Sequence, residues 1–138
     1  MTLTVPENSA ESYPVILKGM NAVQDLLRYD SVCVSKNGDV FEISELSADS
    51  RLVLLHPLEL TVYFDDGLYI VENDVFEIFS FDKSFKNALH DLEIQFYDLW
   101  EDFVSVDESC LAPSGIILKK LLQKYLGEKN DTKNIQSF

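Results

Sequence analysis

The sequence predicts an α+β fold in which a small antiparallel β-sheet is covered by one long amphipathic helix. Three observations predict it: short β-forming runs between residues 52 and 81, Asp- and Gly-containing turns between them, and a helical repeat of large apolar residues after residue 82. The length of 138 residues fits one domain. We expect residues 1–12 to be a flexible arm, residues 13–126 to form the domain, and residues 127–138 to be a polar tail.

The N-terminal part of the domain predicts a short helix followed by a β-hairpin. Residues 20–29 (MNAVQDLLRY) place their apolar side chains at helical spacing. Two β-rich runs, residues 32–35 and 40–43, flank an Asn37-Gly38 pair, which is the strongest short-range hairpin signal. We therefore expect these two runs to pair with each other, and Cys33 to be a small buried side chain.

Four further short runs predict β-strands. Their ranges are 52–55, 58–64, 68–71 and 75–81. The His56-Pro57 step separates the first run from the second, because proline cannot donate to a ladder in the middle of a sheet. The last three runs are joined by tight acidic turns and predict a meander, whose apolar face needs a helix to cover it.

The helix expected to cover this face extends over about residues 82–103. Asp82 or Ser84 can cap its first turn. Its apolar residues recur at spacings of three and four and fall on one side; they are Phe85, Leu89, Leu92, Phe96, Leu99 and Phe103. After Pro113, which is tolerated in a first helical turn, a second helix is expected to run to about Gly127.

Acidic residues dominate the charge of the chain. Eleven Lys+Arg against 24 Asp+Glu give a net charge of −13. Residues 39–108 contain eighteen of the acidic residues and three basic ones, whereas residues 115–138 carry a net charge of +3. Surfaces that bind duplex nucleic acid or anionic membranes need Lys and Arg. The charge therefore disfavours direct nucleic-acid binding and membrane docking, and favours a basic protein as the partner.

Residue types that carry catalysis or bind metal are sparse. His56 precedes Pro57, and His90 lies on the polar side of the long helix, neither of them at catalytic spacing from a Ser, a Cys or the other His. His90 and Glu93 form one i,i+3 pair, whereas metal sites between helices need such pairs from several helices. Asp65-Asp66-Gly67 fits a hairpin turn better than a calcium loop. We expect no enzyme activity, no metal site and no cofactor.

The cysteines and the apolar runs indicate a cytoplasmic protein. Cys33 and Cys110 lie far apart in the sequence, so we expect free thiols in a reducing compartment. Residues 1–10 have neither a basic nor an apolar signal region. No apolar run approaches the ~20 residues that span a bilayer.

The segment from Leu68 to Leu92, LYIVENDVFEIFSFDKSFKNALHDL, has the layout strand, acidic turn, strand and a helix containing an alanine. LAPSG at residues 111–115 is followed by LKKLL at residues 118–122. With these features the chain resembles the HicB-like antitoxins over about residues 58–126. The resemblance implies an αβ core with an N-terminal extension, and a toxin as the partner. The family's glycine-containing helix entry is replaced by residues 80–84, and its DNA-binding segment is not evident.

Acidic and apolar residues share the outer side of the long helix. The candidate partner-binding residues are Asp91, Glu93, Ile94, Tyr97, Asp98, Glu101 and Asp102. Ile94 and Tyr97 lie outside the apolar sector of the helix, and exposed apolar residues among carboxylates are typical of interaction surfaces. Two alternatives stay open: these two side chains pack under the N-terminal half of the chain, and the carboxylates form an ordinary solvated face.

These observations favour a non-enzymatic domain, resembling a HicB-like antitoxin, that uses an acidic face to bind a basic protein such as a toxin or a nuclease. The alternative is an acidic mimic of nucleic acid that inhibits a nucleic-acid-binding protein, as in mobile-element or phage counter-defence. A third class is an enzyme that uses carboxylates alone. The exposed edges of the predicted sheet also leave a homodimer open.

Overall fold

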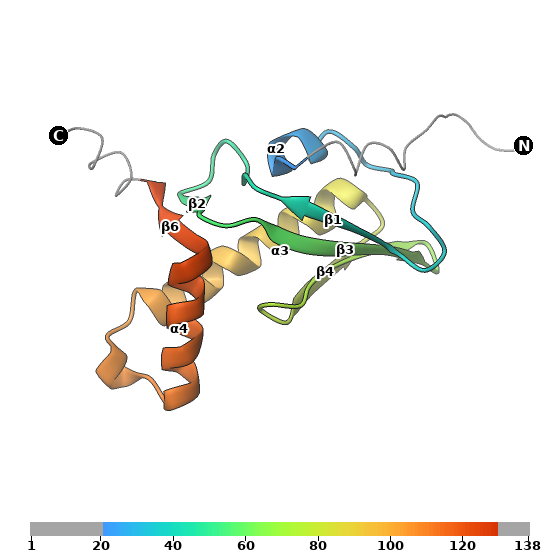
Figure 1. Ribbon diagram of the computed structural model, residues 1–138. Helices are drawn as coiled ribbons and strands as arrows, with labels where there is room; N and C mark the ends of the chain where they lie inside the picture. Colours follow the sequence, from blue (N-terminus) through green and yellow to red (C-terminus); the bar gives the residue numbers. More distant parts are fainter. Residues whose placement is uncertain (1–20, 130–138) are drawn as a thin grey trace, which may run out of the picture.

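The computed structural model describes residues 21–129, and it confirms the α+β class (Figure 1). The main sheet has four antiparallel strands in the order β1-β3-β4-β5. They are β1 (Asp39–Ile43), β3 (Leu58–Asp65), β4 (Leu68–Asn73) and β5 (Ile78–Asp82). The expected flexible arm, residues 1–12, lies outside the described residues, as do residues 130–138 of the expected tail.

The meander predicted between residues 58 and 81 is confirmed, because β3 pairs with β4 and β4 pairs with β5. Val62 lies opposite Val71, and Val71 lies opposite Ser80. The β3–β4 turn contains Asp66 and Gly67 at φ angles of 53° and 79°. Asp and Gly are common at such left-handed positions, so the turn residues and the strand register agree.

The alternation along the strands creates a buried inner face on the sheet. On β3, Leu58, Leu60 and Val62 are at most 1% exposed, whereas the intervening Glu59 is exposed. Helix α3 (Phe85–Leu99) lies behind the sheet in Figure 1 and packs on β4 and β5. Its buried apolar side chains are Phe85, Ala88, Leu89, Leu92 and Phe96. The sheet and this helix together form most of the hydrophobic core, as the sequence predicts.

Helix α3 begins at a serine cap and ends in a wider helical turn. The Ser84 hydroxyl accepts a hydrogen bond from the Asn87 N–H at 3.3 Å, so Ser84 rather than Asp82 is the N-cap residue. At its C-terminal end α3 continues into a π-helix, η1 (Trp100–Val104), where the Ser105 N–H donates to the Trp100 carbonyl at 3.1 Å. The predicted helix over residues 82–103 therefore consists of two helical types.

The C-terminal elements form a second, smaller unit of packing. After a 3₁₀ turn, η2 (Glu108–Cys110), helix α4 (Pro113–Tyr125) packs against η1. A methyl group added at Gly115 would lie 3.4 Å from the Phe103 ring, which shows how closely the two helices approach. Strand β6 (Leu126–Glu128) then pairs with β2 (Leu52–Leu54) in a separate two-stranded sheet. Residues 127 and 128, which we expected in a tail, thus belong to a strand.

The predicted hairpin between residues 32–35 and 40–43 is wrong. Residues 32–35 form no strand, and β1 pairs with β3 instead. The turn itself is present, with Gly38 at φ 89°. The preceding segment is held by Tyr69, whose hydroxyl accepts from the Val32 N–H at 3.0 Å and donates to the Val32 carbonyl at 2.9 Å. Cys33 is exposed, which contradicts the expectation that it is buried.

The N-terminal helix is shorter than predicted. Within the described part of residues 20–29, α2 covers Val23–Leu26, and both end residues of this turn are buried. The segment after it is tied to the start of α3, where the Phe85 N–H donates to the Asp30 carbonyl at 2.7 Å. The Asp30 carboxylate also accepts from the Ser84 hydroxyl at 2.9 Å. The N-terminal part of the domain therefore closes the end of the core where α3 begins.

Candidate protein-interaction surface

Four of the predicted site residues lie on one exposed side of α3 and η1. Asp91, Ile94, Asp98 and Asp102 are all exposed, and we call them the acidic strip. They are spaced by three, four and four residues, so they share one side of the helix, opposite the side that packs on the sheet. Ile94 is 39% exposed in the middle of the strip, and the alternative that it packs under the N-terminal half is wrong for the described residues.

Glu101 lies beside the acidic strip and has a partner within the chain. Its carboxylate forms an ion pair with Arg51 at 3.1 Å, and both side chains are more than half exposed. An exposed ion pair of this kind contributes only about 0–1 kcal/mol. Separating Glu101 from Arg51 would therefore cost little free energy.

Glu93 is not available to a partner, which corrects the prediction for this residue. Its side chain is 2% exposed. The carboxylate accepts hydrogen bonds from the Ser47 N–H at 2.7 Å and from the Ser47 hydroxyl at 2.9 Å. A buried carboxylate needs such partners, because burial removes its hydration. Glu93 thus joins α3 to the loop between β1 and β2 and has a structural role.

Tyr97 is half-buried and packs against the hydrophobic core, so most of its ring is also withdrawn from the surface. Burial raises the pKa of the Tyr97 hydroxyl above its ordinary value, and the Glu93 charge raises that pKa further. The pKa is lowered, in the opposite direction, by hydrogen bonding with Ser50 and Ser47 and by the charge of Arg51. Tyr97 therefore stays protonated and belongs with Glu93 to the packing of the β1–β2 loop.

Negatively charged side chains cluster at the C-terminal end of α3 and η1, where the helix dipole is also negative. Asp98, Glu101 and Asp102 lie within two turns, and neither the last turn of α3 nor that of η1 contains a basic residue. Like charges three or four residues apart destabilise a helix by about 0.2–0.5 kcal/mol per pair. The negative end of the helix dipole adds to this repulsion. The Arg51 ion pair offsets this repulsion at Glu101, and an external cationic group beside Asp98 and Asp102 would relieve the rest.

Sequence reasoning missed a second exposed surface, on the outer face of the sheet. Val40 is 59% exposed, and Phe79 and Phe81 are each 57% exposed. The sequence contains a signal for this surface, because alternation in the strand Ile78–Asp82 places both phenylalanines on one face and Ser80 on the other.

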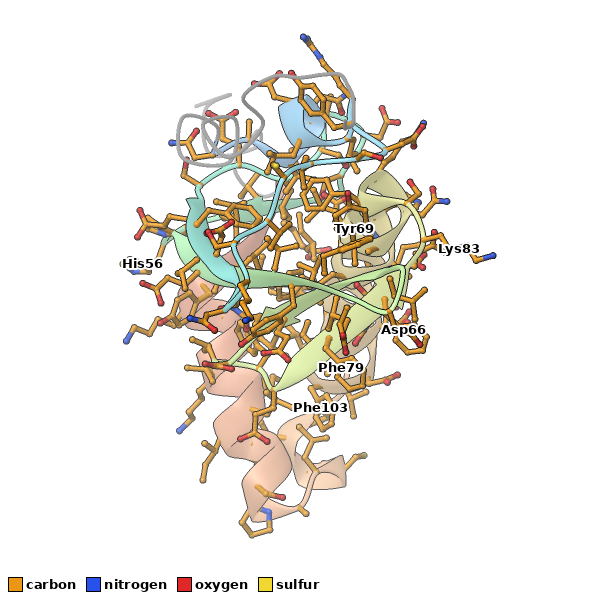
Figure 2. The ribbon with its side chains drawn as sticks, turned by 90° about the vertical axis from the view of Figure 1, so that its right-hand side faces the viewer. His56, Asp66, Tyr69, Phe79, Lys83 and Phe103 are labelled. Carbon is orange, nitrogen blue, oxygen red and sulfur yellow. The ribbon has the colours of Figure 1, made fainter. Side chains whose placement is uncertain are left out.

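The histidines, possible metal ligands and a pocket are the remaining candidate features of the described residues. No group of three or more His, Cys, Asp or Glu side chains among residues 21–129 is arranged to hold a metal ion. His56 and His90 are both exposed, and Figure 2 shows His56 on the opposite side of the molecule from Asp66 and Lys83. An open pocket lies between the β1–β2 loop and β2, lined by small polar and aliphatic side chains with Glu45 and Lys129. No helix in the described part of the chain has the length and apolar character needed to cross a membrane.

Comparison of the chain with protein-family models, with curated proteins and with solved structures gave no match. The function of this chain therefore has to be inferred from its fold and its surface.

Proposed function

We propose that the chain is a non-enzymatic protein-binding domain that holds a basic protein against the acidic strip. The observation that carries this proposal is the strip itself. Asp91 and Asp98 flank the exposed Ile94, and Asp102 lies about one turn beyond Asp98 on the same helix side. The ion pairs among the described residues, Arg28–Asp25 and Arg51–Glu101, involve none of these three carboxylates.

The strip combines the two features that a protein interface needs. Its carboxylates attract a cationic surface over a distance of about 10 Å at 0.1 M salt and increase the rate of encounter. Ile94 supplies an apolar group that loses water when a partner covers it. Apolar side chains exposed among charged ones are found at docking sites, because a partner that covers them removes apolar surface from water.

The resemblance to HicB-like antitoxins supports a particular kind of partner, the small toxin of a toxin–antitoxin pair. A toxin that acts on nucleic acid needs Lys and Arg for its own substrate. Its surface would therefore be complementary to the acidic strip. A basic nuclease that is unrelated to any toxin fits the same surface.

Capture of partners at low salt tests the proposal. The full chain, carrying an affinity tag, is incubated with an extract of its source cells at about 50 mM salt. A variant with Asp91→Asn, Asp98→Asn and Asp102→Asn removes three charges from the strip without changing side-chain size. The matched control, Asp49→Asn with Asp66→Asn and Asp74→Asn, removes three exposed charges elsewhere.

We expect the unmodified chain and the control to recover a basic protein, and the strip variant to recover at least about tenfold less. Equal recovery by the strip variant and the control would refute the role of the strip. Recovery of no basic protein by any of the chains would refute the function. Displacement of the captured protein by DNA or RNA would identify the strip as a nucleic-acid mimic, the alternative that the sequence left open.

A further inference from the structure

The outer face of the four-stranded sheet, on the side away from α3, is a second interaction surface. We propose that it binds a basic amphipathic helix of a partner protein. This inference goes beyond the acidic strip, because the sheet separates the two surfaces. Figure 1 shows α3 on one side of the strands and no described helix on the other.

The apolar part of this face runs across three strands. Tyr63 lies opposite Ile70, and Ile70 lies opposite Phe81, so the three side chains form a row from β3 to β5. Phe79 is the neighbour of Phe81 on the same strand face, and their ring centroids are 6.3 Å apart. Both rings are 57% exposed. Two adjacent phenylalanine rings left largely in water are a contact surface without a partner among the described residues.

The dimensions of this face suit a helix. Four strands about 4.8 Å apart span about 14 Å between the outer two, and same-face residues are about 6.6 Å apart along a strand. A helix about 10 Å in diameter covers most of that width. Helix α3 packs on the inner face in this way, so the sheet already accommodates one helix on its other side.

The acidic part of the face specifies the charge of the partner. Glu42 on β1 lies directly opposite Glu59 on β3, and like charges in this position repel. Glu72 on β4 lies opposite Thr61, which places it diagonally across from Glu59. None of the three glutamates belongs to the ion pairs Arg28–Asp25 and Arg51–Glu101.

Charge complementarity favours a basic helix over a second copy of the chain. Two copies packed face to face would place six glutamates, Glu42, Glu59 and Glu72 of each, in one interface, and each chain has a net charge of −13. A helix with leucine-like residues on one side and Lys or Arg along its flank would cover Phe79 and Phe81 and neutralise the glutamates. This is the helix-in-groove mode of recognition, with an open sheet in place of the groove.

The probe for the test is a synthetic amphipathic peptide of leucine and lysine, about 14 residues long, which is enough for three to four helical turns. It is titrated into the full chain labelled with ¹⁵N, and the amide shifts report which surface it contacts. We expect the largest shift changes at Tyr63, Ile70 and Phe81. The acidic strip on the opposite side of the sheet serves as the internal comparison.

Three variants separate the contributions of apolar contact and of charge to the affinity for the peptide. Phe79→Ser with Phe81→Ser removes the apolar contact, and we expect at least about tenfold weaker binding at every salt concentration. Glu42→Gln with Glu59→Gln removes charge, and we expect weaker binding at low salt and unchanged binding at about 1 M salt. The control is Ile117→Ser on α4, where the side chain is 69% exposed, and we expect less than about twofold change.

Each alternative occupant of the outer sheet face would give a different experimental result. Shift changes confined to the acidic strip, or equal affinity of the phenylalanine variant and the Ile117 control, would overturn the proposal and leave the proposed function standing. Sedimentation that shows a dimer, abolished by the phenylalanine variant, would overturn it in favour of a second copy. Contacts from residues 1–20 to the Phe79 or Phe81 ring in the free full chain, detected as nuclear Overhauser effects, would overturn it in favour of the chain's own N-terminal segment.

Discussion

Replacing Ser47 with alanine removes one of the two hydrogen bonds that hold the buried carboxylate of Glu93. The Ser47 hydroxyl donates to that carboxylate at 2.9 Å, and the Ser47 N–H, which remains in the variant, donates at 2.7 Å. A hydrogen bond to a charged group contributes about 1.5–3 kcal/mol. At about 2.1 cal/mol/K per residue, the unfolding entropy of the 138-residue chain is about 0.29 kcal/mol/K. The loss corresponds to a decrease in Tm of about 5–10 °C.

Urea denaturation, followed by the fluorescence of Trp100, measures this loss as a change in the free energy of unfolding. Ser31→Ala is the matched control, because Ser31 is exposed and its side chain makes no hydrogen bond to another described residue. We expect the control to change the free energy by less than about 0.5 kcal/mol. A Ser47→Ala value within that same range would refute the structural role of Glu93 and return this residue to the candidate binding surface.

Two further predictions concern a turn and a tyrosine. Gly38→Ala should destabilise the chain by more than about 1 kcal/mol in the same assay, because Gly38 has φ 89° and a methyl group there would lie 2.6 Å from the Tyr63 ring. Gly67→Ala, at φ 79° with nothing within 4 Å, should cost less, and an equal or larger cost would contradict the contact with Tyr63. In an absorbance titration compared with Tyr97→Phe, Tyr97 should ionise above its ordinary value of 10.0, because burial raises its pKa. The stability that this raised pKa contributes is present below about pH 10 and lost as the pH rises through the folded-state pKa. Glu93→Gln should lower the pKa of Tyr97, and an unchanged or higher value would exclude the coulombic contribution.

Local patterns were enough to predict the meander and the helix that covers it. The alternation of residues 58–64 and the spacing from Phe85 to Phe103 each define a face within one element. The hairpin prediction failed because the Asn37-Gly38 signal is local, whereas β1 pairs with β3, a strand that follows only after an intervening loop and β2. Strand β2 pairs with β6, some seventy residues away, and three residues carry too little pattern to predict such a pairing.

The candidate surface was predicted in part for a similar reason. Exposure of Asp91, Ile94 and Asp98 follows from the helical spacing alone. Burial of Glu93 depends on the β1–β2 loop folding over α3, which no pattern within the helix contains. A weak signal was present, because Glu93 lies four residues after Leu89 and so stands at the edge of the apolar sector.

The measurement that tests the central claim most directly is the salt dependence of the dissociation constant between the full chain and the basic protein captured at low salt. If acidic surfaces hold the partner, the dissociation constant should rise at least about tenfold between about 50 and 300 mM salt. The variant lacking the charges of Asp91, Asp98 and Asp102 should show a shallower rise. A dissociation constant that does not change with salt, in the unmodified chain and in the variant alike, would contradict the claim that this chain recognises its partner through acidic surfaces.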